Sequence, residues 1–210
     1  DSREIRAGDI FIACPGLVGD GRDHIANAIA AGAVAVLTHL DTDESPSDAR
    51  WAVPVVGVSG LRARLGGFAS EWYGQPSATL QVIAITGTNG KTSCAQWIAQ
   101  ALRGAGIPAG VIGTLGLTLP DGRPEAGSLT TPDVVSVHRT LARLRDLGAQ
   151  CVIMEASSIG LDQGRLDGVA VAVAAFTNLT RDHIDYHGDM QVYEQAKARL
   201  FTWPGLTHAV

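Results

Sequence analysis

Two continuous apolar runs limit the folds available to this chain more than any other feature. CVIMEAS occupies residues 151–157 and VAVAVAAFTNL occupies residues 169–179. Runs without regular polar interruption are typical of strands that are buried on both faces, as in a parallel sheet covered by helices. Both runs are far shorter than the ~20 residues needed to span a membrane. We therefore expect the chain to fold around a covered, mostly parallel sheet.

Strand-like and helix-like segments alternate along the rest of the chain, so the predicted fold class is α/β, with helices on both sides of a sheet. Residues 1–60 are predicted to form a small α/β domain, and residues 61–210 a larger, mostly parallel sheet domain of the phosphate-loop type. Ligands of such sheets gather where the strands end. Further strands are expected at 9–14, 33–39, 53–59, 81–87 and 109–116, and helices at 24–33, 61–74, 91–106, 131–148 and 190–201.

Composition excludes several classes of protein. The 210 residues are 46% hydrophobic, enough for a packed core, and their formal net charge of -5 argues against a general binder of nucleic acid or of anionic membranes. Three widely spaced cysteines without metal-binding spacing favour a reducing, cytoplasmic setting. Because the chain starts without methionine and stops where a strand could begin, we expect a fragment of a longer protein.

The segment ITGTNGKTS (85–93) joins an expected strand to an expected helix. The common pattern G-x-x-x-x-G-K-[ST] would place its first glycine at Ile85, but the glycine comes at Gly87. The helix start can attract an anion, Lys91 can reach a terminal phosphate, and the Thr92 hydroxyl can ligate Mg²⁺. The alternative is a plain strand-to-helix turn with a solvated lysine. We favour a shorter type of nucleotide phosphate loop, which leaves the reaction open.

Later segments carry groups that could complete a site at the same sheet edge. Glu155 could ligate Mg²⁺ or orient water, or it could be a hydrogen-bonded structural acid. Lys197 shares a helix face with Tyr193 and Leu200; it could extend to solvent, or lie near a metal with a lowered pKa or a modification. A dense group of His and Asp could ligate a metal or cap helices and face solvent: Asp182, His183, Asp185, His187 and Asp189.

Several polar residues suit ligand contacts, although each has a simpler reading. Thr130 and Thr131 precede an expected helix and could be its N-cap. Arg165 suits carboxylate or phosphate, while Ser157 and Gln163 could equally be capping or surface groups. The beginning of the chain, with a Ser/Arg start and a glycine-rich loop at 16–21, reads only as a possible polar ligand loop.

Together these segments resemble the Mur ligase family, most closely its UDP-N-acetylmuramyl-tripeptide synthetase branch (the MurE type). The matching stretches occur in the family's order and cover nearly the whole chain: DSR…GDIFIA, DGRDHI, ITGTNGKTS, LTTPD, MEASSIGLDQGR, TNLTRDHIDYHG and YEQAKARLF. GTNGKT is shared with folylpolyglutamate synthetases. The combination of SSxGLxQxR with NLTRDHxDYHG is much more specific to the tripeptide-synthetase type.

The resemblance implies a role for most of these residues. The first domain would hold the uridine diphosphate part of the substrate through Ser2, Leu17, Val18 and Gly19. ATP would bind Gly87, Thr88, Asn89, Gly90, Lys91 and Thr92. The muramyl-dipeptide part would contact Thr130, Thr131, Ser157, Gln163 and Arg165. Mg²⁺ would be held by Thr92, Glu155, His183 and an N-carboxylated Lys197, and the catalytic residues would be Lys91, Glu155, His183 and Lys197. Leu17 and Leu129 replace the His and Asn of many relatives, so substrate contacts there are expected to differ.

The implied activity is an ATP-dependent amide-bond ligase of peptidoglycan synthesis, and hence of cell-wall formation, cell shape and division. It would add meso-diaminopimelate or L-lysine to UDP-N-acetylmuramoyl-L-alanyl-D-glutamate through an acyl phosphate. The resemblance leaves the amino acid open, because the deciding residues are expected beyond position 210. We expect a cytoplasmic monomer without nucleic-acid partners or membrane insertion. We also expect that the family's C-terminal, amino-acid-binding domain is absent from these residues and that this piece alone is inactive.

Three rival readings remain. DYHG (185–188) fits the D-x-x-G element of a GTPase, but no N-K-x-D motif follows and the phosphate loop is short. A folate-glutamylating ligase would share GTNGKT, although the DSR domain argues against it. A nucleotide-binding module without catalysis would show the loop without forming a product.

Overall fold

The computed structural model describes residues 2–16, 19–40, 51–127 and 129–210. The chain divides into two compact units, Asp1–Arg64 and Leu65–Val210. The division falls inside helix α2 (Leu61–Trp72). Each unit is described by itself. Among the described residues, no helix has the length and apolar character needed to cross a membrane.

The first unit is built on a three-stranded parallel sheet. Its strands are β1 (Ile10–Ala13), β2 (Ala35–Leu40) and β3 (Val55–Ser59), in the order β1-β2-β3. Helix α1 (Ile25–Ala30) and two short 3-10 helices, η1 (Ser2–Glu4) and η2 (Gly21–His24), accompany the sheet. Phe11, Ile25 and Val36 form part of its buried core. The expected small α/β unit is therefore present.

The second unit is built on a seven-stranded sheet in the order β10-β9-β4-β8-β5-β6-β7. All neighbouring strands are parallel except where β6 pairs with β5 and with β7. The strands are β4 (Gln81–Thr86), β5 (Ala109–Gly113), β6 (Gly116–Thr118), β7 (Pro124–Glu125), β8 (Cys151–Glu155), β9 (Val173–Phe176) and β10 (His208–Ala209). The helices are α3 (Lys91–Gly104), α4 (Val134–Asp146), α5 (Ser158–Asp162), α6 (Ile184–His187) and α7 (Met190–Ala198), with 3-10 helices η3 (Pro76–Ala78) and η4 (Arg199–Thr202).

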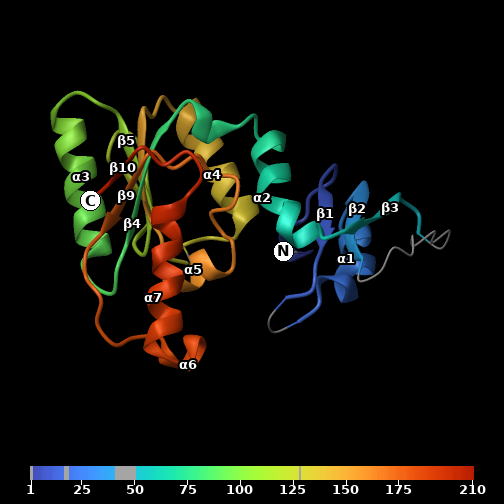
Figure 1. Cartoon of the computed structure of the whole chain (residues 1–210). Helices are drawn as coiled ribbons and strands as arrows, with labels where there is room; N and C mark the ends of the chain where they lie inside the picture. The colour runs from blue at the N-terminus through green and yellow to red at the C-terminus, as the bar shows by residue number, and fades with distance from the viewer. Residues whose placement is uncertain (1, 17–18, 41–50, 128) are drawn as a thin grey trace. The chain divides into compact units, whose positions relative to one another are not determined.

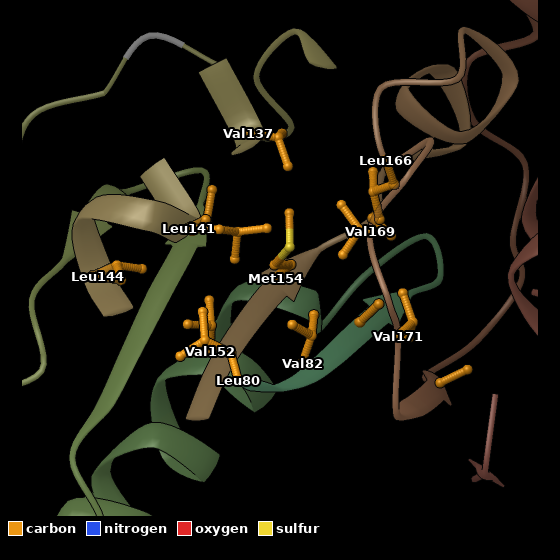
Figure 2. Close-up of a cluster of buried hydrophobic side chains, with 14 of the residues drawn as sticks. Leu80, Val82, Val137, Leu141, Leu144, Val152, Met154, Leu166, Val169 and Val171 are labelled. Carbon is orange, nitrogen blue, oxygen red and sulfur yellow. The ribbon is translucent and has the colours of Figure 1, made fainter. Parts of the chain in front are cut away.

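Both faces of this sheet are covered, which explains the continuous apolar runs. Helix α3 lies on one side and α4 on the other (Figure 1). Since successive side chains of a strand point to opposite faces, Val152 and Met154 of β8 pack with Leu141 of α4 (Figure 2). Ile153 packs on the other face with Ala95 of α3. The α/β fold and the mostly parallel sheet predicted from the sequence are confirmed.

Three expected elements differ from the structure. The apolar run at 169–179 is a strand only at Val173–Phe176. Before it, Ala172 N still donates to Val82 O of β4, whereas Ala170 N donates to the Ser77 hydroxyl. The run at 109–116 is divided into β5 and β6, which form an antiparallel hairpin. The helix expected from residue 131 starts later, because Asp133 caps it by accepting a hydrogen bond from Ser136 N.

The strand order brings three strand ends together. Strand β4 lies between β8 and β9, with Ile85 opposite Glu155 and Thr86 opposite Phe176. The chain passes from β4 through α3 to β5, beyond β8, and later returns to β9 on the other side of β4. Such a reversal of strand order places a ligand-binding crevice at the carboxyl ends of the strands. The loops after β4, β8 and β9 should therefore hold the site.

Candidate nucleotide and metal site

The loop after β4 has the geometry of a short phosphate-binding loop. Ile85 is fully buried in the strand, so the loop begins at Gly87. Gly87 and Gly90 have φ values of 139° and 85°, which other residues rarely adopt. Helix α3 begins directly afterwards at Lys91, and Gly90 provides no side-chain cap. The first-turn N–H groups and the positive end of the helix dipole are thus suited to an anion.

Lys91 folds back over this loop. Its ammonium donates hydrogen bonds to Gly87 O at 2.8 Å and to Thr88 O at 2.9 Å. Burial lowers the pKa of Lys91, while the negative charge of Glu155 opposes that shift. The cation is held at the loop, where a terminal phosphate would need it.

Glu155 is fixed at the end of β8. It is only 1% exposed. Its Oε1 accepts from Thr114 N at 2.9 Å, and its Oε2 lies 3.0 Å from both the Thr92 and the Thr114 hydroxyls, which donate to it. Gly113 leaves room for this carboxylate, since a Cβ there would clash with it. Carboxylate and hydroxyl oxygens are the donors that Mg²⁺ prefers, so Thr92 and Glu155 fit that ion.

Both lysines of the chain meet at one carbonyl oxygen. Lys197 is 2% exposed, and its amine donates to Gly87 O at 2.9 Å, the same acceptor that Lys91 uses. Its Nζ lies 4.3 Å from the centre of the Tyr193 ring. Burial lowers the pKa of Lys197 to about 8; the charge of Lys91 adds to this effect and Asp182 opposes it. The amine therefore carries a substantial neutral fraction near physiological pH, and the solvent-directed alternative is wrong for Lys197.

Most side chains of the His/Asp segment after β9 are exposed. His183 is exposed, has a left-handed backbone (φ 51°), and lies 3.6 Å from Asp182 through its Nε2. Among the described residues, no group of three or more His, Cys, Asp and Glu side chains is placed to hold a metal ion. The structure brings Thr92 and Glu155 together. It places the His183 ring 6.3 Å, centre to centre, from the ring of Tyr193, whose hydroxyl lies 3.0 Å from that of Thr88.

Two other members of that segment have structural roles. Asp189 caps α7 by accepting from Val192 N at 2.9 Å, as the capping alternative predicted. His187 is buried, and its Nε2 lies 3.0 Å from the Ser158 hydroxyl. Burial lowers the pKa of His187, which favours a neutral ring inside the fold.

A second group of predicted residues forms one hydrogen-bonded network next to Glu155. The Thr131 hydroxyl is 2.8 Å from Glu155 O and 3.0 Å from the Ser157 hydroxyl. Arg165 donates to Thr131 O at 2.7 Å and twice to Gln163 Oε1, at 2.9 and 2.7 Å. Because the Arg165 partners are uncharged oxygens, its positive charge is not neutralised by them. The network is suited to an anionic or carbonyl-rich ligand.

The two threonines do not cap α4, because Asp133 does. Thr130 instead places its hydroxyl 3.0 Å from that of Thr114, which links the network to Glu155. Sequence reasoning missed Thr114; a hydroxyl residue at the end of an expected strand was the available signal. It named Tyr193 and the TNLT stretch (177–180) but gave neither a role at the loop. The hydroxyl of the buried Tyr193 is 3.0 Å from that of Thr88.

The predicted substrate residues of the first unit are only partly described. Ser2 lies in η1. Gly19 O accepts from Gly16 N at 2.8 Å, which closes the glycine-rich loop. Leu17 and Val18 lie outside the described residues, so their role stays a prediction.

Two family models match the chain. The Mur ligase family catalytic-domain model matches residues 1–73, and the Mur ligase middle-domain model matches residues 85–209. Among curated proteins, the UDP-N-acetylmuramoyl-L-alanyl-D-glutamate--2,6-diaminopimelate ligase of Janthinobacterium sp. (strain Marseille) is 50% identical, with 100% of this chain and 42% of the relative covered. The protein of the same description from Pseudomonas aeruginosa is 51% identical, with 98% and 42% covered.

Two solved structures superpose on this chain. A structure of a ligase of that description superposes with a TM-score of 0.79 at 34% identity, covering 100% of this chain and 41% of the other. The MurF ligase from Thermotoga maritima in complex with ADP shares the fold, with a TM-score of 0.62, 24% identity, and 95% and 41% coverage. The chain thus spans about two fifths of the length of the curated relatives it matches.

Proposed function

The chain belongs to the Mur ligase family, and we propose that the whole protein is the ATP-dependent ligase that adds meso-diaminopimelate to UDP-N-acetylmuramoyl-L-alanyl-D-glutamate. The observation that carries this proposal is the meeting of the Thr92 hydroxyl and the Glu155 carboxylate beside a phosphate loop. It occurs in a chain about half identical, along its whole length, to proteins described as diaminopimelate ligases. Those descriptions favour diaminopimelate over L-lysine.

The first chemical step joins a substrate carboxylate to phosphate. The side-chain carboxylate of the D-glutamate residue attacks the γ-phosphorus of ATP, the bond to the β-phosphate oxygen breaks, and an acyl phosphate and ADP result. Negative charge grows on the transferred phosphoryl and leaving oxygens. The Lys91 ammonium, which lies over the loop, and the N–H groups at the start of α3 would offset that charge, an effect that commonly contributes much of the rate.

Mg²⁺ would be held by Thr92, Glu155, His183 and Lys197, and when bound it would supply positive charge to the phosphate oxygens. The fit rests on the oxygen donors Thr92 and Glu155. Thr114 orients both oxygens of Glu155 by donating a hydrogen bond to each.

Lys197 suits N-carboxylation. The neutral amine attacks CO₂, a C–N bond forms, and one proton is released, leaving a carbamate. A pKa of about 8 keeps part of the amine neutral and therefore nucleophilic. The product has oxygen acceptors and a negative charge, and it retains one N–H for Gly87 O. Carboxylation would also relieve the repulsion between two lysine cations that share that carbonyl.

The remaining residues would bind the nucleotide-sugar peptide. Thr130, Thr131, Ser157, Gln163 and Arg165 would contact the muramyl-dipeptide part beside Glu155, and Ser2, Leu17, Val18 and Gly19 the uridine diphosphate. The amine of the incoming amino acid then attacks the acyl carbon and phosphate leaves, which makes the amide bond. We propose a cytoplasmic monomer without nucleic-acid partners.

The test uses the full-length protein with ATP, Mg²⁺, UDP-N-acetylmuramoyl-L-alanyl-D-glutamate and one amino acid at a time. Mass spectrometry should detect a tripeptide product with meso-diaminopimelate and little with L-lysine. A lysine-containing product would replace the amino-acid assignment. ATP binding without any product would support a nucleotide-binding module instead.

A further inference from the structure

The short phosphate loop has a close neighbour after β9, the segment Thr177–Thr180, which begins the stretch TNLTRDHIDYHG. Thr88 N donates to Asn178 O at 2.9 Å. The Thr88 hydroxyl donates to Thr180 O at 3.1 Å and accepts from Thr180 N at 3.0 Å. The first residue after Gly87 is therefore bound to this segment through both its backbone and its side chain.

Asn89 is held by the same segment through one side-chain amide. Asn178 Oδ1 accepts from Asn89 N at 3.0 Å, and Asn178 Nδ2 donates to Asn89 O at 3.1 Å. The Thr177 hydroxyl also donates to Asn89 O, at 2.6 Å. Since Asn89 N and Asn89 O belong to successive peptide units, Asn178 fixes the orientation of both.

These bonds decide which N–H groups of the loop can face a phosphate. An N–H group makes one strong hydrogen bond, so those of Thr88 and Asn89 are already used. The first backward bond of α3 runs from Cys94 N to Gly90 O at 2.9 Å. The N–H groups of residues 90–93 precede it, and in the described part of the chain none of them has an acceptor. They remain, with the Lys91 ammonium, for an anionic ligand.

This loop is shorter than the common type of phosphate loop. The common pattern has four residues between its glycines, whereas only Thr88 and Asn89 separate Gly87 from Gly90. The N–H groups of those two residues point to the neighbouring segment and not to the ligand side. The approach also needs a glycine at 87, because a Cβ there would clash with Thr177 and come close to Asn178.

We propose that Asn178 is a positioning residue that holds the loop so that the N–H groups of residues 90–93 converge on the nucleotide phosphates. It contacts the loop and not the nucleotide. The inference rests on the proposed function only in taking ATP as the ligand. Asn178 is exposed, so each of its bonds competes with water and the expected effect is moderate.

The experiment measures binding of Mg²⁺–ATP to full-length Asn178→Ala and Asn178→Asp directly, by calorimetry, together with the KM values for ATP and for the nucleotide-sugar substrate. Asn27→Asp is the matched control, because Asn27 is exposed on α1 and undergoes the same change of amide to carboxylate. Melting temperatures are recorded for all variants.

Asn178→Ala should weaken ATP binding about tenfold, as the loss of two ordinary hydrogen bonds predicts. Asn178→Asp should weaken it further, because a carboxylate oxygen would replace the donor that faces Asn89 O. The KM for the nucleotide-sugar substrate and the melting temperature should change little, and Asn27→Asp should bind ATP as the parent does. ATP affinity within twofold of the parent in both Asn178 variants would overturn the proposal, as would an equal rise of both KM values with a lowered melting temperature. Because ATP binding is read directly, failure to form a tripeptide would count against the proposed function and not against this inference.

Discussion

Glu155 and His183 are expected to serve the same Mg²⁺, yet the fold treats them differently. Glu155 ends a central strand, is 1% exposed and accepts hydrogen bonds from Thr92 and Thr114. His183 is the N-cap of the four-residue helix α6, is exposed, and has Asp182 and the Tyr193 ring as near neighbours. A ligand placed by a strand is oriented before the ion arrives. A ligand on a short connecting segment must be oriented by the ion and by the rest of the site.

The largest predicted effect is that of Glu155→Gln in the full-length protein. We predict a fall of about 1,000-fold in kcat, because Mg²⁺, which would offset charge at the reacting phosphate, would lose a carboxylate ligand. The unfolding free energy should also fall by about 1–3 kcal/mol, since the new amide would present a donor to the donors of Thr114. Steady-state kinetics and urea unfolding test both effects. Unchanged stability would show that Glu155 is not bound as described.

Lys197→Met tests a second buried group of the proposed metal site. The pKa of Lys197 is lowered from 10.5 to about 8, so the unfolded chain binds this proton more tightly than the folded one. Stability of the parent should therefore rise as the pH rises from about 8 to 10.5. The cost of the buried cation below pH 8 is about 3 kcal/mol.

The Met variant should accordingly be more stable than the parent at pH 7, and this advantage should shrink toward pH 10.5, while ligase activity is lost. Urea unfolding in CO₂-depleted buffer with chelator measures the difference. A gap between the two proteins that stays constant over that pH range would contradict a lowered lysine pKa.

His183→Gln tests the exposed ligand. We predict that activity falls about 10–100-fold, as for weakened metal binding. The unfolding free energy should change by less than about 0.5 kcal/mol, because the side chain is exposed. If His183→Gln lowered stability as much as Glu155→Gln does, the contrast between the two ligands would fail.

Thr114→Val has the smallest predicted effect on activity and tests whether Thr114 orients Glu155. It removes the hydroxyl at 3.0 Å from Glu155 Oε2 and keeps the N–H bond to Oε1. We predict a loss of about 1 kcal/mol in stability and a several-fold lower affinity for Mg²⁺. Thr140→Val, at a partly exposed position of α4, is the matched control. Equal effects of the two substitutions would show that Thr114 does not orient Glu155.

The sequence was sufficient for the parts of the site that follow from single strands. The strand patterns at 81–87 and 151–157 predicted β4 and β8, so the loop at Gly87 and the acid at Glu155 could be expected at one sheet edge. Ile85, which breaks the common loop pattern, is a fully buried strand residue. Residue spacing left Lys197 either in solvent or near a metal, and the family resemblance added the N-carboxylated form as a metal ligand.

The remaining parts depend on strand order, which local patterns do not contain. Thr114 reaches Glu155 because β5 is the neighbour of β8, and Asn178 reaches the loop because β9 is the neighbour of β4. The hairpin of β5 and β6 was missed because β6 has only three residues. Asp133, and not Thr130 or Thr131, caps α4, since the threonines are engaged by Glu155, Ser157 and Thr114.

The most direct test of the central claim asks whether the buried Glu155 and the exposed His183 hold the same ion. Mn²⁺ replaces Mg²⁺ in the full-length protein with a non-hydrolysable ATP analogue, and electron spin-echo spectroscopy records nitrogen couplings to the metal. We predict an imidazole ¹⁴N coupling that disappears in His183→Gln, together with strongly weakened Mn²⁺ binding in Glu155→Gln. An identical spectrum for the parent and His183→Gln would contradict the claim.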